Sequence, residues 1–159
     1  MSTLQNKKIR GYQLIERIGK GGFGEVYRAY QPTIGREVAI KVIMPEHANQ
    51  ADFIRNFETE AKMVARLEHP FIMPLFDYWR EPTGAYIVMR YLRGGTLKEE
   101  IDKGQMPLLR IADILDHVCS ALWTAHRNNV AHRDIKPANI MLDEEGRAYL
   151  SDFGLAIIV

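Results

Sequence analysis

The sequence predicts an α+β fold in which a five-stranded antiparallel sheet with one main helix comes first and a helical region follows. Apolar residues mostly alternate with polar ones between Tyr12 and Met44, and turn residues interrupt the alternation, as in an antiparallel meander. After the glycines at positions 94 and 95 the apolar spacing becomes that of amphipathic helices. We therefore expect a strand-rich part and a helix-rich part.

Three strands are expected in the first third of the chain, at residues 12–18, 25–30 and 36–43. The glycine-rich segment 19–24 joins the first two, and the segment 31–35, with a proline and a glycine, joins the others. Because both connections are short, the three strands should pair as an antiparallel meander.

A helix is expected at about residues 52–67, with one apolar face formed by Phe53, Phe57, Ala61, Val64 and Leu67. It should stop before Pro70, since the residue before a proline is biased away from helical geometry. Residues 71–79 and 85–91 are then expected as two more strands, separated by the turn signal at 81–84. These elements complete the five-stranded part.

Further along the chain, Thr96 and Glu99 have the spacing of a capping box and predict the start of a short helix. Pro107 suits the first turn of a long helix that ends near Asn128. Its apolar stripe is expected to face the core and consists of Leu108, Ile111, Leu115, Val118, Cys119 and Leu122. Residues 140–143 and 148–151 are expected as a hairpin that turns at 144–146.

Composition excludes several classes of protein. The 159 residues are 47% hydrophobic and 26% charged, as in ordinary globular domains, and 21 basic residues nearly balance 20 acidic ones. No global field therefore favours nucleic acid or an anionic membrane as a partner. The single cysteine, Cys119, allows neither an internal disulfide nor a cysteine zinc site, and it fits a reducing, cytoplasmic location. Neither a secretion signal nor a membrane-spanning run of apolar residues is predicted.

The most informative segment is 132–139, which is followed by Asp152-Phe153-Gly154. Its groups suit the transfer of a phosphoryl group from a magnesium-bound nucleotide to a hydroxyl. Asp134 can orient and deprotonate the hydroxyl, and Asp152 and Asn139 offer oxygen ligands to hard Mg²⁺ ions. Lys136, two residues after Asp134, is close enough to contact the transferred phosphate. His132 is assigned a structural role, because an imidazole at an apolar-to-polar junction is usually a hydrogen-bonded core group.

The pattern G-x-G-x-x-G occurs at Gly19, Gly21 and Gly24. A dinucleotide fold would place a helix after the last glycine, and a Walker loop would need Gly-Lys-Ser/Thr, so neither fits. A phosphate-covering hairpin and an ordinary hairpin turn remain. Lys41 is either a solvated edge lysine or a partner of nucleotide phosphates and of a helix carboxylate. Glu60 is the candidate for that carboxylate and Glu58 is its rival. His117 and His126 lack metal-ligand company and are read as packing or surface histidines.

These motifs together resemble the N-terminal part of the catalytic domain in the protein kinase family, of the bacterial serine/threonine type. The phosphate-covering loop, the strand 38–41, the catalytic loop and the turn 152–154 occur in family order, and the likeness covers about residues 12–156. It implies a protein-kinase-like two-lobe fold after an N-terminal tail at 1–11. Residues 12–92 would form the N-lobe and hinge, and 93–159 the start of an incomplete helical C-lobe.

The resemblance implies ATP as the nucleotide, Mg²⁺ with Mn²⁺ as an alternative, and protein substrates with Ser/Thr acceptors. Catalytic roles would fall to Asp134, Lys136, Lys41 and Glu60, and metal binding to Asn139 and Asp152. Met89 would be the gatekeeper and residues 90–92 the hinge. Nucleotide contacts would come from Ile18, Gly19, Lys20, Gly21, Gly22, Phe23, Gly24, Val26, Ala39, Lys41, Met89, Arg90, Leu92 and Met141. Arg133 would pair with a phosphate on an activation loop.

One departure from the family pattern is large. Protein kinases continue past the magnesium turn into an activation segment and several helices, whereas this sequence ends at Val159. We expect a truncated product with exposed apolar surface, an unpaired apolar end at 157–159 and a tendency to aggregate. Two alternatives follow: a non-catalytic fragment that binds nucleotide or a partner kinase, and a small-molecule kinase of related fold. Segment 136–139 favours protein kinases over the second. The oligomeric state is not predicted.

Overall fold

A computed structural model of the chain describes residues 4–22 and 24–153. Contacts divide it into two compact units, residues 1–58 with 75–91, and residues 59–74 with 92–159. The predicted division at residues 92 and 93 stays a prediction; in the structure, residues 59–74 belong with the later part of the chain. The expected apolar end at 157–159 lies outside the described residues.

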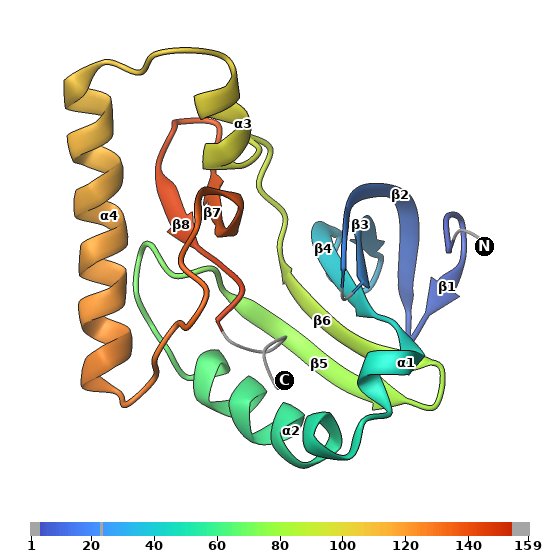
Figure 1. Cartoon of the computed structure of the whole chain (residues 1–159). Coiled ribbons are helices and arrows are strands. Elements are labelled where there is room, and N and C mark those ends of the chain that lie inside the picture. Colours follow the sequence, from blue (N-terminus) through green and yellow to red (C-terminus); the bar gives the residue numbers. More distant parts are fainter. Residues whose placement is uncertain (1–3, 23, 154–159) are drawn as a thin grey trace. The chain divides into compact units, whose positions relative to one another are not determined.

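The first unit contains a six-stranded antiparallel sheet with the order β1-β2-β3-β4-β6-β5 (Figure 1). The strands are β1 (Lys8–Ile9), β2 (Tyr12–Gly21), β3 (Gly24–Gln31), β4 (Arg36–Ile43), β5 (Leu75–Glu81) and β6 (Gly84–Arg90). The predicted meander is confirmed, since β3 pairs with β2 on one side and with β4 on the other. Its core lies on one face and includes Leu14, Tyr27, Val38, Ile40, Trp79 and Val88.

Three details of this unit correct the sequence-based prediction. The sheet has a sixth strand, β1, within the predicted tail. It has only two residues, which is too short for an alternation of apolar and polar residues to be recognised in the sequence. β5 begins at Leu75 rather than at residue 71, because Pro74 has no N–H for a ladder and Ile72 instead bridges Leu150 in the second unit. A short helix, α1 (Pro45–Ala48), begins at its proline and was not predicted.

Helix α2 (Ala51–Ala65) is the predicted main helix, and it ends two residues earlier than expected. Phe53, Phe57, Ala61, Val64 and Leu67 are all buried, so the predicted apolar face is confirmed. The Phe53 and Phe57 rings stack with centroids 5.0 Å apart, and the Phe57 and Tyr78 rings make a T-shaped contact with centroids 6.0 Å apart. This stacking fixes the first half of α2 against the sheet of its own unit.

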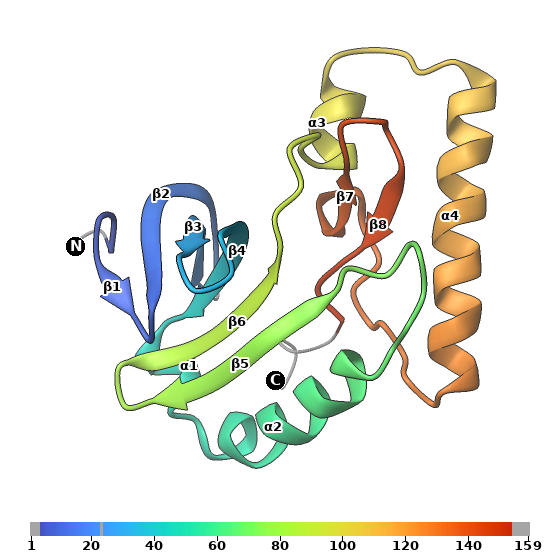
Figure 2. The ribbon, with the colours of Figure 1, turned by 180° about the vertical axis from the view of Figure 1, so that it is seen from behind.

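The second unit combines helices α3 (Leu97–Asp102) and α4 (Leu108–Arg127) with a short hairpin of β7 (Ile140–Leu142) and β8 (Ala148–Leu150). The capping box at the start of α3 is confirmed: Thr96 Oγ1 accepts from the Glu99 N–H, and the Glu99 carboxylate accepts from the Thr96 N–H. Helix α4 lies along β8 (Figure 2). The 3₁₀ turn η1 (Pro137–Asn139) leads into β7.

The buried side of α4 agrees only in part with the predicted stripe. Val118 of that stripe is buried and Leu122 is half-buried, whereas Leu108, Ile111, Leu115 and Cys119 are exposed. The other buried residues of the helix are Ile114, Ala121 and Ala125. Ala121 and Ala125 are fully buried in the helix that contacts β8. Although α4 has 20 residues, neither it nor another helix within 4–22 and 24–153 is apolar enough over a sufficient length to span a membrane.

The exposed apolar side of α4 leads to a prediction about association. Leu108 and Leu109 are 81% exposed, Trp123 is 61% and Leu115 is 56%. Apolar residues clustered on one helix face favour contact between molecules. We expect the 159-residue chain to self-associate in analytical ultracentrifugation and to bind a hydrophobic dye. Leu109→Gln with Leu115→Gln should lower both signals several-fold, while Ile34→Gln, at an exposed site in the other unit, should not. Equal behaviour of the two variants would contradict this expectation.

Candidate functional site

Four residues of the second unit form a closed ring of hydrogen bonds around the predicted catalytic loop. The Asp134 N–H donates to His132 Nδ1 at 3.2 Å, so the His132 proton lies on Nε2, which donates to the Ser151 carbonyl at 2.7 Å. Ser151 Oγ donates to the Asn139 carbonyl at 2.9 Å. Asn139 Nδ2 closes the ring on Asp134. His132 is 1% exposed, so its predicted structural role is confirmed.

Asp134 is the centre of the predicted chemistry, and two other predicted site residues, Lys136 and Asn139, hold its carboxylate. Lys136 Nζ lies 2.7 Å from Oδ2, and Asn139 Nδ2 donates to the same oxygen at 2.8 Å. The hydrogen bond from Lys136 is the main cause that lowers the pKa of Asp134, with further help from Asn139 and opposition from burial. The carboxylate is therefore ionised at neutral pH, and it can accept a hydrogen bond from an incoming hydroxyl.

Asn139 is oriented in a way that fits a role as cation ligand. Nδ2 uses both of its hydrogens on Asp134, one on the backbone carbonyl and one on the carboxylate, each at 2.8 Å. The amide oxygen Oδ1 is thereby turned away from Asp134 and can face a cation. Asp152 adds a carboxylate directly after Ser151. Amide and carboxylate oxygens are the ligands that Mg²⁺ takes, so the residues present fit this ion.

Backbone strain accompanies these residues. Arg133 and Asp152 have φ values of 65° and 57°, in the left-handed region that residues other than glycine rarely adopt. Each such conformation costs about 1–3 kcal/mol and lasts only where the surroundings enforce it. Arg133 directly precedes Asp134, and Asp152 is itself the predicted metal ligand, so two of these conformations fall within the candidate site; Asn6, Arg10 and Asn129 have positive φ values elsewhere.

Four of the predicted nucleotide-binding residues of the first unit, Val26, Ala39, Lys41 and Met89, share one face of the sheet, whereas Arg90 lies opposite Val38 on the other face. Val26 lies opposite Lys41, Ala39 opposite Met89, and Gly19 opposite Val26, and directly opposed residues of antiparallel strands point to the same side. Ala39 and Lys41, two apart on β4, point the same way. Val26, Lys41 and Met89 are partly exposed on this face, whereas Ala39 is buried, at 6% exposed.

The glycine segment forms the predicted hairpin, with Gly21 at the end of β2 opposite Gly24 at the start of β3. Arg17 Nη1 meets the buried carboxylate of Glu25 at 2.7 Å and ties the two arms together, and Tyr27 Oη donates to the same carboxylate. Ile18 is 41% exposed on this hairpin. Lys20 and Gly22 lie on the same hairpin, and Phe23 falls outside the described residues.

The segment after β6 is anchored in the second unit. The Gly94 N–H donates to the Leu142 carbonyl at 3.0 Å, and the Leu142 N–H donates to the Gly95 carbonyl at 2.9 Å. Thr96 bridges Met141, and Leu92 is buried. Leu92 and Met141, both predicted adenine contacts, are thus held in one unit, whereas Met89 and Arg90 end β6 in the other.

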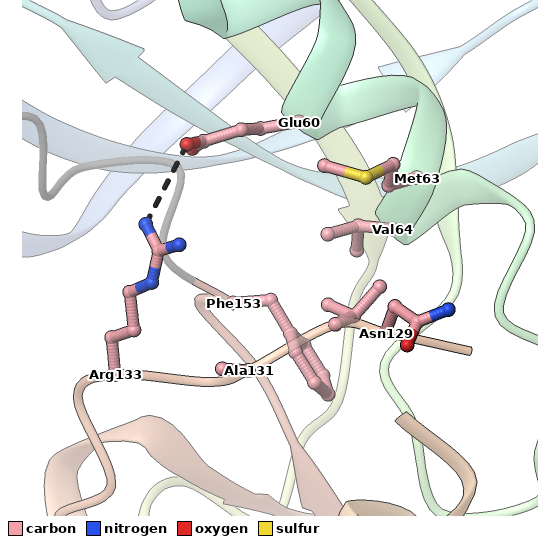
Figure 3. Close-up of a pocket in the computed structure, with 8 residues that line it drawn as sticks. Glu60, Met63, Val64, Asn129, Ala131, Arg133 and Phe153 are labelled. Atoms are coloured by element: carbon pink, nitrogen blue, oxygen red, sulfur yellow. Dashed lines mark ion pairs between the residues drawn. The ribbon is translucent and has the colours of Figure 1, made fainter. Parts of the chain in front are cut away.

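Glu60 is half-buried on α2 and belongs to the second unit. Burial raises the pKa of its carboxyl, and Arg133, whose Nη1 lies 3.9 Å from Oε1, opposes that rise. The two residues meet at the rim of a pocket that Val64 and Phe153 help to line (Figure 3). The pocket of about 50 Å³ holds a few water molecules at most and no nucleotide. The predicted pairing of Glu60 with Lys41, in the other unit, stays a prediction.

Buried His132 makes the stability of the second unit depend on pH. Burial lowers the pKa of His132 and also that of His69. Below about pH 6.5 the unfolded chain begins to protonate its histidines, whereas these two stay neutral in the folded chain. Their contribution to the free energy of unfolding is complete above about pH 6.5 and falls as the pH decreases. The pKa values of Asp134 and Asp143 are lowered in the folded chain, so the stability that these carboxylates contribute is lost only at more acidic pH, below about pH 4.

We therefore expect the melting temperature to fall as the pH is lowered from 7 to 5. The free energy of unfolding should decrease by no more than about 1.4 kcal/mol per pH unit for each histidine. His132→Asn should flatten this slope. His126→Asn, at an exposed position of α4, should keep it, and a parent-like slope in the His132 variant would contradict the assignment. Thermal melts of the three proteins across this pH range provide the measurement.

The structure also corrects or extends other expectations about single residues. His117 packs on Phe71 at 3.8 Å between ring centroids, and its Nδ1 accepts from the Ala148 N–H, which confirms the packing role. Sequence reasoning missed Ser151 and Gly94. A Cβ at Gly94 would lie 2.5 Å from the Leu142 carbonyl oxygen, so only glycine fits. A serine next to Asp152 was the one available signal for Ser151.

Comparisons with known proteins agree with this geometry. The sequence profile described as "Protein kinase domain" matches residues 12–159. The chain is 42% identical over 155 residues to the serine/threonine-protein kinase PrkC of Bacillus subtilis, and the match covers 96% of this chain and 24% of PrkC. It is 38% identical over 146 residues to the serine/threonine-protein kinase PknD of Mycobacterium tuberculosis, covering 91% of this chain and 22% of PknD.

Among solved structures, the PknI kinase domain of Mycobacterium tuberculosis matches with a TM-score of 0.88 at 30% identity. The match covers 98% of this chain and 63% of the PknI chain. The chain thus spans about a quarter of the length of the curated relatives and under two thirds of this solved domain.

Proposed function

This chain belongs to the protein kinase family, and from that premise we propose that it carries the nucleotide-binding and phosphoryl-transfer residues of a serine/threonine protein kinase. The observation that carries the proposal is the arrangement at Asp134, whose carboxylate is held by both Lys136 and Asn139. The reaction moves the γ-phosphoryl group of ATP to a Ser or Thr hydroxyl of a protein.

In this reaction Asp134 accepts the hydrogen bond of the acceptor hydroxyl and aligns its oxygen with the γ-phosphorus. As the new O–P bond forms, the bond from the γ-phosphorus to the β,γ-bridging oxygen breaks, ADP leaves with that oxygen, and Asp134 takes up the hydroxyl proton. Lys136, 2.7 Å from Asp134, adds a positive charge beside the transferred group, where it stabilises the phosphoryl oxygens. The face with Val26, Ala39 and Met89 offers apolar contacts for the adenine. The backbone N–H groups of the glycine hairpin and Lys41 offer donors to the phosphates.

Asn139 and Asp152 would hold Mg²⁺ through their side-chain oxygens. When bound there, the ion neutralises charge on the phosphates of ATP. The ring of hydrogen bonds through His132 and Ser151 keeps these two ligands in place relative to Asp134. The residues of this chain thus supply a base, two cation ligands and a charged group for one transfer.

The test compares acceptors. The 159-residue chain, and a chimera that adds the part of the PknI kinase domain not covered by it, are incubated with radiolabelled ATP and Mg²⁺. We expect the chimera to label casein on serine and threonine and to leave aminoglycosides and choline unlabelled. Lys41→Met should lower the labelling at least about 100-fold, since a charge that stabilises the transferred phosphates is removed. Labelling of the metabolites alone would overturn the proposal in favour of a small-molecule kinase.

A second candidate function is a fragment that binds nucleotide without transferring phosphate. The exposed apolar side of α4 supports it, because clustered apolar residues on one helix face suit contact with a partner protein. This candidate would be favoured if ATP and Mg²⁺ raised the melting temperature while neither the 159-residue chain nor the chimera transferred phosphate.

A further inference from the structure

Ser151 is the one member of the hydrogen-bonded ring around Asp134 to which sequence and family resemblance gave no role. It is 3% exposed and directly precedes Asp152. All of its polar groups are used on the catalytic loop. Both Oγ and the backbone N–H donate to the Asn139 carbonyl at 2.9 Å, and the Ser151 carbonyl accepts from His132 Nε2 at 2.7 Å.

The hydroxyl is distinct from the other contacts because a backbone cannot supply it. The N–H bond to Asn139 extends the β7–β8 ladder by one residue beyond the pair of Ile140 and Leu150, and any residue would form it. The bond from Oγ needs a serine or a threonine. A single side-chain atom therefore decides whether Asn139 is held by one donor or by two.

The two sides of Asn139 are fixed by different partners. Its side-chain amide donates to Asp134, and its backbone carbonyl accepts a hydrogen bond from the Ser151 hydroxyl. Ser151 is bonded covalently to Asp152, whose φ of 57° is strained and needs a fixed predecessor. The hydroxyl thus lies on the shortest connection between the two side chains that offer oxygens to a cation.

We propose that Ser151 is a positioning residue for divalent cation binding: its hydroxyl fixes the spacing between the Asn139 amide and the Asp152 carboxylate. This inference rests on the proposed function, in which those two residues hold Mg²⁺. Groups that orient metal ligands affect metal affinity by about 10- to 100-fold when they are removed. The loss of one of two donors on Asn139 should fall at the lower end of that range.

The experiment measures cation binding rather than turnover. The chain is saturated with β,γ-imido-ATP, which cannot transfer its phosphate, and free Mn²⁺ is followed by electron paramagnetic resonance. We expect Ser151→Ala to weaken Mn²⁺ binding about tenfold. Ser151→Thr, which keeps the hydroxyl, should restore the affinity to within about twofold of the parent. Ser120→Ala, which removes a comparable hydroxyl bond to the His117 carbonyl within α4, should leave it unchanged.

Several outcomes overturn the proposal. Parent-like Mn²⁺ affinity in a folded Ser151→Ala protein does so, and so does a loss that Ser151→Thr fails to restore. If the alanine variant does not fold, Ser151→Cys, with a weaker donor of similar size, takes its place and should weaken Mn²⁺ binding in the same direction. If neither variant folds, Ser151 only stabilises the fold and the proposal is rejected.

The same measurements separate this inference from the proposed function. A parent protein that binds Mn²⁺ with nucleotide, while the chimera transfers no phosphate, would overturn the proposed function and leave the comparison of Ser151 variants valid. A parent that binds no Mn²⁺ in the presence of nucleotide would overturn the cation site and with it the role of Ser151. Normal phosphate transfer with equal Mn²⁺ affinity in all variants would overturn this inference alone.

Discussion

Asp134→Asn is expected to reduce phosphate transfer by about 1,000-fold while the KM for ATP changes less than about threefold. General-base groups contribute about 10²–10⁴ to rate. The amide keeps the size of the carboxylate but has neither its charge nor its basicity, so the acceptor hydroxyl loses its proton acceptor. ATP binding does not use this group in the proposed mechanism, which is why the effect should fall on kcat.

The measurement is single-turnover labelling of casein by the chimera. Asp116→Asn is the matched control, because it makes the same chemical change at an exposed position of α4 outside the ring of hydrogen bonds. Since Lys136 keeps the pKa of Asp134 below its ordinary value, the parent should also show no loss of activity from this carboxylate between pH 9 and about pH 5. Labelling within threefold of the parent by the Asp134 variant would exclude it as the base.

Gly24→Ala is expected to destabilise the first unit by about 2–4 kcal/mol, whereas Gly21→Ala should change its stability by less than about 0.5 kcal/mol. A Cβ at Gly24 would lie 2.0 Å from the Val42 carbonyl oxygen and 3.1 Å from Ile43 Cα. Both contacts are with backbone, so β3 must move away from β4 and lose pairing between them. A Cβ at Gly21 meets no atom of the described residues within 4 Å.

The two glycines therefore serve different purposes. Gly24 is required by packing, while a need for glycine at Gly21 would come from a ligand that approaches the backbone. We expect Gly21→Ala to lower ATP affinity several-fold in a titration without changing the melting temperature. Gly24→Ala should lower the melting temperature by about 10 °C. An unchanged ATP affinity in Gly21→Ala would mean that the hairpin is an ordinary turn and does not cover phosphates.

Much of the local structure followed from the sequence. The alternation in residues 12–43 predicts which side of each strand faces the core, and the structure confirms a buried face with Tyr27, Val38 and Ile40. Ala39 and Ile43, on the other side of β4, are buried as well. The capping box at Thr96 and the apolar face of α2 were also readable, because both depend on spacings within one element. Spacing along the chain likewise brought Asp134, Lys136 and Asn139 together, since a short loop joins them.

Elements that depend on distant partners could not be read in this way. The start of β5 at Leu75 depends on Ile72 bridging Leu150, which is far away in sequence. The buried side of α4 could not be chosen because apolar residues lie all around the helix, and the side that is buried includes the small Ala121 and Ala125. The sixth strand, β1, depends on pairing with β2 alone.

The sequence by itself determined the family, the order of its motifs and the identities of the groups that can act on a phosphate and a hydroxyl. These properties depend on residue type and on short spacings. Only the tertiary structure decided that Ser151 closes a ring through His132, Asn139 and Asp134, and that Gly24 is fixed by packing while Gly21 lies open. The reason is that a hydrogen bond or a steric contact between segments depends on distances that arise only when the chain has folded.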